Sequence, residues 1–229
     1  MTTLRLAWLA LWIAITAMPA AAFQVRPVRL DLSARVPAAQ LTVSNPTARP
    51  LLIQADAFDW TQIDGRDRLL PASAVILNPP IFELAPGASQ VVRVGLRQGA
   101  LPGVERSHRV WLTQVLTAAD REAGGIQMAL RVSLPVFVLG DQTGAPVPSW
   151  SQTSDALVLT NAGARHLHVH DLQLATPDGQ RDTLGPCYAL PGSACRWLLP
   201  APLRGQALRI EADSDAGPLK GRLDAPAPH

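Results

Sequence analysis

Three histidines, His166, His168 and His170, alternate with Leu167 and Val169 in a spacing that could bind zinc. Alternate residues of a β-strand share one face, and histidines brought together on such a face can act as zinc ligands. The same alternation is typical of an ordinary strand in which Leu and Val point into a core and the histidines face solvent. We favour the ordinary strand over a metal site.

Sequence motifs of known catalytic chemistry are missing. The chain contains no G-x-S-x-G nucleophile elbow, no phosphate-binding P-loop and no H-E-x-x-H zinc motif. We therefore expect a protein that is not an enzyme and that uses no cofactor and no metal. A metal-binding periplasmic protein, which would rest on the three histidines alone, is the least favoured alternative.

The first 22 residues have the plan of a secretory signal peptide. Arg5 precedes a nearly all-apolar stretch at residues 6–16, and Ala20 and Ala22 then stand as A-x-A before Phe23. The apolar stretch is shorter than the ~20 residues that a membrane-spanning helix needs. We expect residues 1–22 to be cleaved on export, so that the mature chain is not inserted in a membrane.

The chain contains two cysteines, Cys187 and Cys195, in a stretch rich in proline and glycine. An even number of cysteines in an exported protein favours a disulfide, because the compartment is oxidising. A zinc site would need about four ligands, and the surrounding stretch lacks histidines or carboxylates at a suitable spacing. The sequence therefore predicts one disulfide that closes a local loop.

The composition excludes several classes of protein. Hydrophobic residues make up 48% and charged residues 17%, which excludes an extended disordered chain. The 20 basic and 18 acidic residues give a net charge of +2 without any run of basic residues, so we expect no nucleic-acid partner. The 21 prolines and 16 glycines interrupt the chain too often for a bundle of long helices.

Short β-rich segments separated by turn signals run through the mature chain, which is typical of antiparallel β-sandwiches. A stretch rich in Gly and Pro at residues 140–148 (G-D-Q-T-G-A-P-V-P) indicates a linker. The sequence therefore predicts an all-β fold with two domains, residues 23–140 and 147–223. The predicted strands are residues 40–45, 50–57, 89–96, 109–116 and 126–139, followed by 156–161, 166–175, 195–199 and 206–212.

Residues 124–139 (G-G-I-Q-M-A-L-R-V-S-L-P-V-F-V-L) alternate strictly over most of their length. Pro135 cannot donate a ladder hydrogen bond, which predicts an edge strand. A long apolar edge strand is an aggregation hazard unless it is meant to be paired. We therefore favour a strand that binds a partner over one that only covers its own sandwich. The hydrophobic parity consists of Ile126, Met128, Leu130, Val132, Leu134, Val136 and Val138.

Longer motifs occur along the same chain. They are V-R-P-V-R-L near the mature start, L-T-V-S-N-P, P-P-I-F-E-L-A-P-G-A-S-Q-V-V-R-V-G-L, E-R-S-H-R-V and I-Q-M-A-L-R-V-S-L-P-V-F-V. Together they resemble a periplasmic pilus-assembly chaperone of the chaperone–usher pathway, over about residues 23–222 and most specifically in the N-terminal domain. The L-P-V-F-V ending is most similar to the archaic, spore-coat-U type. The resemblance implies two immunoglobulin-like β-sandwich domains joined at an angle.

The resemblance also implies a function. Such chaperones bind, cap and stabilise pilin subunits in the periplasm by lending them a strand, which is known as donor-strand complementation. They then deliver the subunits to an outer-membrane usher for fimbria assembly. The donor positions of the family fall on Ile126, Met128, Leu130 and Val132.

Family chaperones anchor the C-terminal carboxylate of the pilin between their domains with two basic residues. Arg29 in R-P-V-R-L matches the first of these, but Pro135 stands where the best-known members have the second, a lysine. We expect Arg109 in S-H-R-V to replace that lysine, because a guanidinium can bind a carboxylate through two hydrogen bonds.

A secreted structural subunit of a fimbria, a pilin or adhesin, is the main alternative. A pilin would lack one strand and carry a donor extension at its mature N-terminus, whereas residues 23–33 here lead straight into the pattern of the first domain.

Overall fold

The computed structural model describes residues 23–97, 103–118, 122, 128–141 and 144–226, which form an almost entirely β protein. The predicted signal peptide lies outside the described residues. No helix among the described residues is long and apolar enough to cross a membrane. The strands are β1 (Gln24–Arg26), β2 (Leu30–Leu32), β3 (Ala38–Ser44), β4 (Leu51–Ile63), β5 (Arg66–Pro71), β6 (Val75–Asn78), β7 (Ile81–Leu84), β8 (Ser89–Leu96), β9 (Arg106–Val115), β10 (Arg131–Val138), β11 (Pro148–Gln152), β12 (Ala156–Asn161), β13 (Leu167–Ala175), β14 (Arg181–Leu184), β15 (Cys187–Ala189), β16 (Ser193–Leu198), β17 (Leu208–Ser214) and β18 (Leu219–Leu223).

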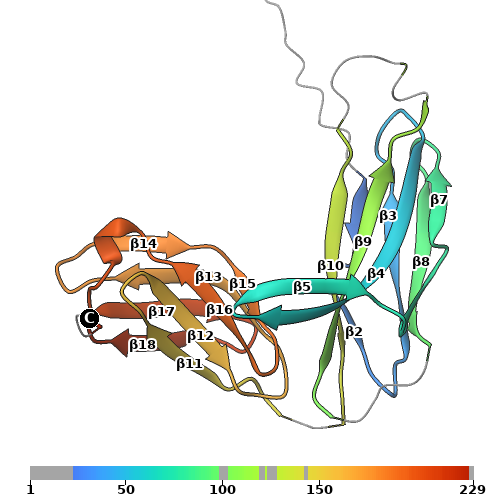
Figure 1. The fold of residues 1–229 in the computed structure, drawn as a ribbon. Helices are drawn as coiled ribbons and strands as arrows, with labels where there is room; N and C mark the ends of the chain where they lie inside the picture. Colours follow the sequence, from blue (N-terminus) through green and yellow to red (C-terminus); the bar gives the residue numbers. More distant parts are fainter. Residues whose placement is uncertain (1–22, 98–102, 119–121, 123–127, 142–143, 227–229) are drawn as a thin grey trace, which may run out of the picture.

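These strands form two sandwiches that stand at an angle to each other (Figure 1). In the first sandwich, the sheet β1-β3-β8-β6 packs against the sheet β2-β10-β9-β4-β5, in which β7 also pairs with β4. In the second, β11-β12-β16 packs against β14-β13-β17-β18, in which β15 also pairs with β13. The predicted all-β class with two immunoglobulin-like sandwiches is confirmed. Of the predicted linker, residues 140–148, the described part follows β10 and overlaps β11 at Pro148.

The alternation of the sequence explains why these segments form strands. In β17, L-R-I-E-A-D-S, every second residue is buried and the others are exposed. In β3, Leu41 and Val43 are fully buried in the core of the first sandwich while their neighbours are not. A strand of this kind has one face on a core and one in solvent, as antiparallel sandwiches require.

One asparagine ends the equivalent strand in each sandwich. The Asn45 side-chain amide, after β3, donates to the carbonyls of Arg49, Leu84 and Ala85. Asn161, at the end of β12, donates in the same way to the carbonyls of residues 165, 189 and 190. Both asparagines are buried. The two segments read L-T-V-S-N-P-T-A-R-P-L and L-V-L-T-N-A-G-A-R-H-L, so the repeated device is also visible in the sequence.

The boundaries of two strands, β8 and β12, agree with the prediction to the residue. β4 differs most, because it continues to Ile63 and pairs with β5 in a hairpin that the prediction did not contain. The hairpin turns at Asp64 and Gly65, which both have positive φ. A Cβ on Gly65 would lie 2.9 Å from the Cβ of Arg196 on β16, so the hairpin tip packs closely on the second sandwich.

Candidate functional site

The strand β10 is paired along its whole length on one side only. It runs antiparallel to β9 from Arg131 to Val138, but β2 pairs with it only from Val136 to Val138. Residues 131–135 therefore present an open edge, and Pro135, which has no N–H to donate, ends this part. Figure 1 shows β10 on the side of the first sandwich that faces the second.

The structure divides the apolar face of this segment into three zones. Met128, which precedes the strand, is 83% exposed. Leu130 and Val132 are partly buried and pack against the core of the first sandwich, so these two predicted donor residues are not free of their own domain. Ile126 lies outside the described residues. The remaining members of the face are fully part of the first core: Leu134, Val136 and Val138.

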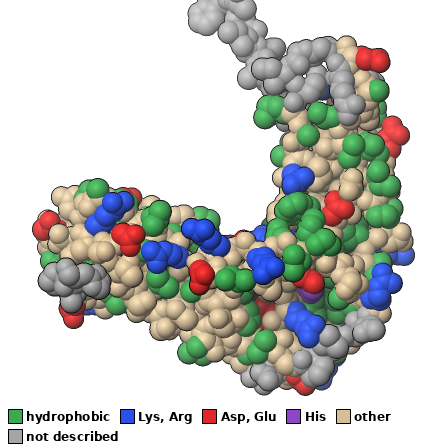
Figure 2. Space-filling view, viewed as in Figure 1, with side chains coloured by type: hydrophobic (Ala, Val, Ile, Leu, Met, Phe, Trp, Pro, Cys, Tyr) green, Lys and Arg blue, Asp and Glu red, His purple; other side chains and the backbone are tan. Residues whose placement is uncertain are grey.

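The other face of β10 lies toward the junction, the region where the two sandwiches meet. Phe137 is completely buried there, in a small cluster with Trp60 of β4 and Leu190 of the second sandwich, against which Leu69 and Tyr188 also pack. The Phe137 ring centroid lies 6.1 Å from that of Trp60 and 5.8 Å from that of Tyr188. Figure 2 shows hydrophobic side chains gathered where the sandwiches meet, with basic and acidic side chains interspersed over the face.

Arg29, the first predicted anchor, already has two acidic partners. Its Nε lies 3.0 Å from Asp31 Oδ2, and its Nη1 lies 3.3 Å from Asp215 Oδ2 of the second sandwich. Burial by itself lowers the pKa of Arg29, but the two carboxylates outweigh it and raise that pKa. Arg29 is thus an ion-pair link between the sandwiches, and a third carboxylate would have to share or displace one of its partners.

Arg109, the second predicted anchor, differs from Arg29 in that it contacts aromatic rings and not carboxylates among the described residues. Its guanidinium carbon lies 3.7 Å from the Trp60 ring centroid and 5.5 Å from that of Tyr188. No ion pair or hydrogen bond joins this guanidinium to any residue that the structure describes. Burial lowers the pKa of Arg109, opposed by Asp67 and Tyr188 at longer range. A partly buried cation without an acceptor is suited to bind an anionic oxygen.

His166 lies in the junction and not on an exposed face, so the sequence-based interpretation of all three histidines as solvent-facing was wrong for this residue. Leu167 and Val169 are buried as predicted. Glu105, just before β9, accepts hydrogen bonds from the His166 backbone N at 2.9 Å and from Nδ1 at 2.7 Å. The imidazole also stacks on Phe137, with 3.5 Å between ring centroids.

The charge state of His166 depends on acidic groups from both sandwiches. Its Nε2 lies 3.3 Å from Asp215 Oδ2, an ion-pair contact that is not aligned as a hydrogen bond. Burial by itself lowers the pKa of His166, but Asp215 and Glu105 outweigh burial and raise it. Conversely, burial raises the pKa of Asp215, but His166, the His168 N–H and Arg29 outweigh burial and lower it to about 2. These groups form a charged link across the junction.

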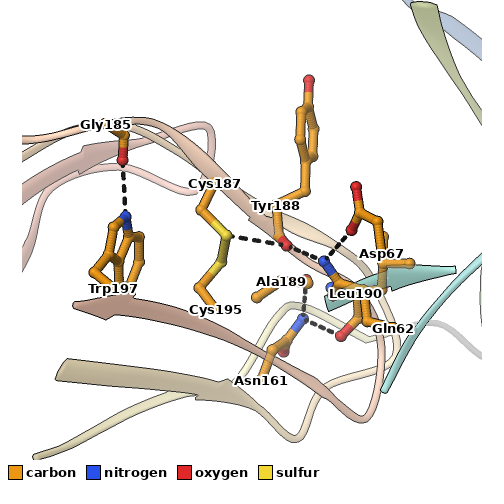
Figure 3. The surroundings of a disulfide bond; sticks show 10 residues. All are labelled: Gln62, Asp67, Asn161, Gly185, Cys187, Tyr188, Ala189, Leu190, Cys195 and Trp197. Carbon is orange, nitrogen blue, oxygen red and sulfur yellow. Dashed lines mark hydrogen bonds between the residues drawn. A yellow bond between two sulfur atoms is a disulfide. The ribbon is translucent and has the colours of Figure 1, made fainter. Parts of the chain in front are cut away.

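The predicted disulfide joins Cys187 to Cys195, and so ties β15 to β16 (Figure 3). The residue after Cys187 is Tyr188, whose backbone carbonyl accepts a 2.7 Å hydrogen bond from Gln62 Nε2. The Leu190 N–H donates to Gln62 Oε1 at 3.1 Å. Gln62 of the β4–β5 hairpin thus contacts the disulfide-bonded segment of the second sandwich with both the NH2 group and the oxygen of its side-chain amide.

Sequence reasoning identified Arg29 and Arg109 but missed most of the junction. The partners come from segments far apart in the chain, as Arg29 and Asp215 are 186 residues apart. No local pattern signals such pairing. The one usable signal is that Phe137 interrupts the polar parity of its strand, and a hydrophobic residue on that parity must be buried against something else. The missed residues are Trp60, Glu105, Phe137, His166, Tyr188, Leu190 and Asp215.

Comparison with known protein families identifies a match in the N-terminal part of the chain. The family described as "Pili and flagellar-assembly chaperone, PapD N-terminal domain" matches residues 22–143, which is more than half of the chain. No curated protein matches the chain in sequence.

Several solved structures have a similar fold over most of both chains. The complex of the CsuC chaperone with the CsuE tip subunit, from archaic Csu pili of Acinetobacter baumannii, matches with a TM-score of 0.70 and 19% identity over 89% of this chain and 97% of that one. The SafB chaperone with the SafA pilin of Salmonella enterica matches with a TM-score of 0.66 and 19% identity over 90% of this chain and 99% of that one. The CupB2 chaperone of Pseudomonas aeruginosa matches with a TM-score of 0.59 and 17% identity over 89% of this chain and 100% of that one.

Proposed function

Because the chain belongs to the family of pili and flagellar-assembly chaperones, we propose that it binds a pilin subunit along the open edge of β10. The pilin would pair its backbone with residues 131–135. Met128 would insert into the open groove of the pilin together with Ile126, while Leu130 and Val132 would extend the contact from the chaperone's own core.

The observation that carries this proposal is the combination of an unpaired edge and an exposed apolar residue in line with it. Met128 is 83% exposed although its parity continues into the buried core. Burying one large aliphatic side chain contributes roughly 1.5–3 kcal/mol. A long apolar edge left open in this way is otherwise a hazard, so a partner that covers it accounts for both features.

Arg109 is the stronger candidate for the anchor of the pilin's C-terminal carboxylate. Its guanidinium has no acceptor among the described residues, whereas Arg29 is already paired with Asp31 and Asp215. Arg29 would join as a second anchor by exchanging Asp215 for the pilin carboxylate.

The names of similar proteins suggest the partners. CsuC and SafB were solved with a tip subunit and a pilin, respectively. We extend this to the present chain as a chaperone of spore-coat-U-like pilins that delivers them to an outer-membrane usher. It would act in the periplasm after removal of residues 1–22, with residues 23–140 as the pilin-binding domain and 147–223 as the second domain. A fimbrial subunit is disfavoured by the family match.

Co-expression of the chain with candidate pilins, chosen from secreted β-proteins encoded near it, tests this function. The wild-type chain should yield a 1:1 complex on size-exclusion chromatography. Arg109→Ala should remain folded and lose the complex, because truncating one partner of a desolvated charged pair costs about 2–5 kcal/mol. Arg109→Lys should retain part of the binding, since it keeps the charge without the planar fork.

Arg131→Ala is the matched control. Arg131 is an exposed arginine on β10, the strand next to the β9 strand of Arg109, and its parity is opposite to that of Met128. Its guanidinium lies over the Trp111 ring, so its loss should leave the complex intact. Failure of the wild-type chain to bind any neighbouring pilin would contradict the proposed function.

A further inference from the structure

The second sandwich contributes the phenol side chain of Tyr188 to the junction. Its ring lies 5.4 Å from Trp60 in an edge-on arrangement and 5.8 Å from Phe137. The two predicted anchors flank this aromatic cluster. Arg109 lies over Trp60 and Tyr188, and the Arg29 guanidinium carbon lies 5.2 Å from the Phe137 ring centroid.

Both the ring and the backbone of Tyr188 are held in place. The imidazole of His168 stacks on the ring almost in parallel, with 3.8 Å between centroids and 3° between planes. Burial, with additional repulsion from His170, lowers the pKa of His168 to about 4, so this support is neutral near pH 7. The backbone is fixed by the disulfide of Cys187 and by the hydrogen bond from Gln62 (Figure 3).

The hydroxyl of Tyr188, by contrast, has no hydrogen-bond partner among the described residues. Figure 3 shows the ring pointing away from the disulfide, with the hydroxyl at its far end. Burial raises the pKa of Tyr188, and the nearby charges of Arg109 and Arg29 oppose that shift. The hydroxyl is therefore a neutral hydrogen-bond donor in the electrostatic field of both guanidinium groups. An oriented donor near a guanidinium without an acceptor is suited to bind an anionic oxygen.

The acids nearby do not supply the missing acceptor. Asp31 is engaged by Arg29, and Asp215 is engaged by Arg29, by the His168 backbone N–H and by His166. The Tyr188 hydroxyl is therefore available to a bound molecule that brings its own acceptor.

We infer that the Tyr188 hydroxyl donates a hydrogen bond to the C-terminal carboxylate of the pilin while Arg109 pairs with the same group. This inference rests on the proposed function and adds a role for the second sandwich, which would thereby recognise a chain that ends in a free carboxylate at this position. Tyr188 acts here as a binding residue whose position depends on the disulfide and on Gln62.

Tyr188→Phe tests this directly, because it removes only the hydroxyl and keeps the stack on His168. The dissociation constant of the purified chaperone is measured for the neighbouring pilin and for the same pilin extended by two glycines, which moves the carboxylate away. Tyr188→Phe should weaken binding of the native pilin about tenfold or more, because a hydrogen bond to a charged group is lost. Binding of the extended pilin should change less than about twofold, with no acceptor left at the site.

Equal weakening for both pilins would show that Tyr188 acts by packing and would overturn the inference. Unchanged binding of the native pilin by a folded Tyr188→Phe chain would overturn it as well, while leaving the proposed function intact. A wild-type chain that binds neither pilin would overturn the proposed function and this inference together.

Discussion

The two sandwiches are built on one plan but differ in how much hydrophobic surface they expose. Of the eleven large hydrophobic side chains that are exposed among the described residues, nine belong to the first sandwich and two, Val147 and Leu198, to the second or its approach. The nine are Val28, Val36, Ile63, Leu70, Ile76, Ile81, Val91, Val104 and Met128. Single exposed hydrophobic side chains are common on protein surfaces. Met128 is unusual because it continues the line of an open strand edge.

The two sandwiches are otherwise built alike, so the difference in exposed hydrophobic surface is not a general property of the fold. Asn45 and Asn161 fix the same turn in each sandwich, and Gly87 and Gly192 then donate to their backbone carbonyls at 2.8 and 2.9 Å. The second sandwich adds a disulfide between β15 and β16, where the first has none. The second sandwich is therefore crosslinked, and the first keeps one strand, β10, half-paired. We interpret the first as the binding module and the second as its support.

The largest effect expected is on binding, from Met128→Glu. Met128 is exposed in the free chain, so a glutamate there should leave the thermal transition unchanged. In the complex the charge would be buried without a partner, which costs several kcal/mol or more, so binding should fall by at least about a hundredfold. The measurement is the dissociation constant for the neighbouring pilin. Leu130→Glu is less informative, since Leu130 also packs against the chaperone's own core.

Ala129→Glu provides the matched control for that variant. Ala129 is exposed and has the opposite parity, so the same charge one residue away should affect binding little. Equal loss in both variants would show that parity does not decide which residues meet the pilin.

The disulfide is a stabilising feature of the second sandwich that the first sandwich lacks. Its loop spans a sequence separation of 8, for which chain-entropy arguments give a stabilisation of about 2–3 kcal/mol. The double variant Cys187→Ser with Cys195→Ser should lower the free energy of unfolding by that amount in chemical denaturation. Intact-mass analysis of the wild-type chain without reductant should show two hydrogens fewer than the reduced chain. Two titratable thiols in the native exported protein would contradict the crosslink.

The two asparagines test whether the sandwiches share one plan. Asn45→Ala and Asn161→Ala each leave buried carbonyl groups without donors, at a cost of about 1–3 kcal/mol. Both variants should therefore lose similar stability in urea denaturation, whereas Gln173→Ala, at an exposed position of β13, should lose almost none. A cost at only one of the two asparagines would show that the apparent repeat is not equivalent in energy.

The smallest effect concerns pH. The folded chain raises the pKa of His166, so the stability it contributes is fully present below the unfolded value of about 6.5 and is lost as pH rises through the folded value. The free energy of unfolding of the wild-type chain should fall over this window relative to His166→Gln, which cannot titrate. His108 and His168, whose pKa values burial lowers, act with the opposite sign and are present in both chains. Parallel pH profiles would show that His166 does not couple the sandwiches through its charge.

Local patterns were sufficient to predict the all-β class and nine of the strands. They missed β1, β2, β5, β6, β7, β11, β14, β15 and β18. Alternation placed β8 and β12 correctly, and the lack of any other cysteine left Cys187 and Cys195 with one possible partner each. Strand periodicity reports which residues face a core, and that information is local. The predicted signal peptide and Ile126 lie outside the described residues and stay predictions.

The junction could not be predicted in the same way, because it depends on how two finished domains meet. His166 belongs to an alternating strand segment, yet Glu105 and Phe137 from the first sandwich bury it. Pattern also could not tell Arg29, which is paired across the junction, from Arg109, which is not. Parity likewise gave one uniform apolar face to residues 126–138, where the structure grades it from an exposed Met128 to a fully buried Val136.

Hydrogen–deuterium exchange of the free chain and of its 1:1 complex with the neighbouring pilin tests whether β10 is the strand that binds the pilin. Pilin binding should slow exchange at residues 128–135, which comprise the segment just before β10 and the open part of its edge. Exchange should not slow at β18, which is the open edge of a sheet in the second sandwich. Protection at β18 with none at residues 128–135 would contradict the assignment of β10 as the strand that binds the pilin.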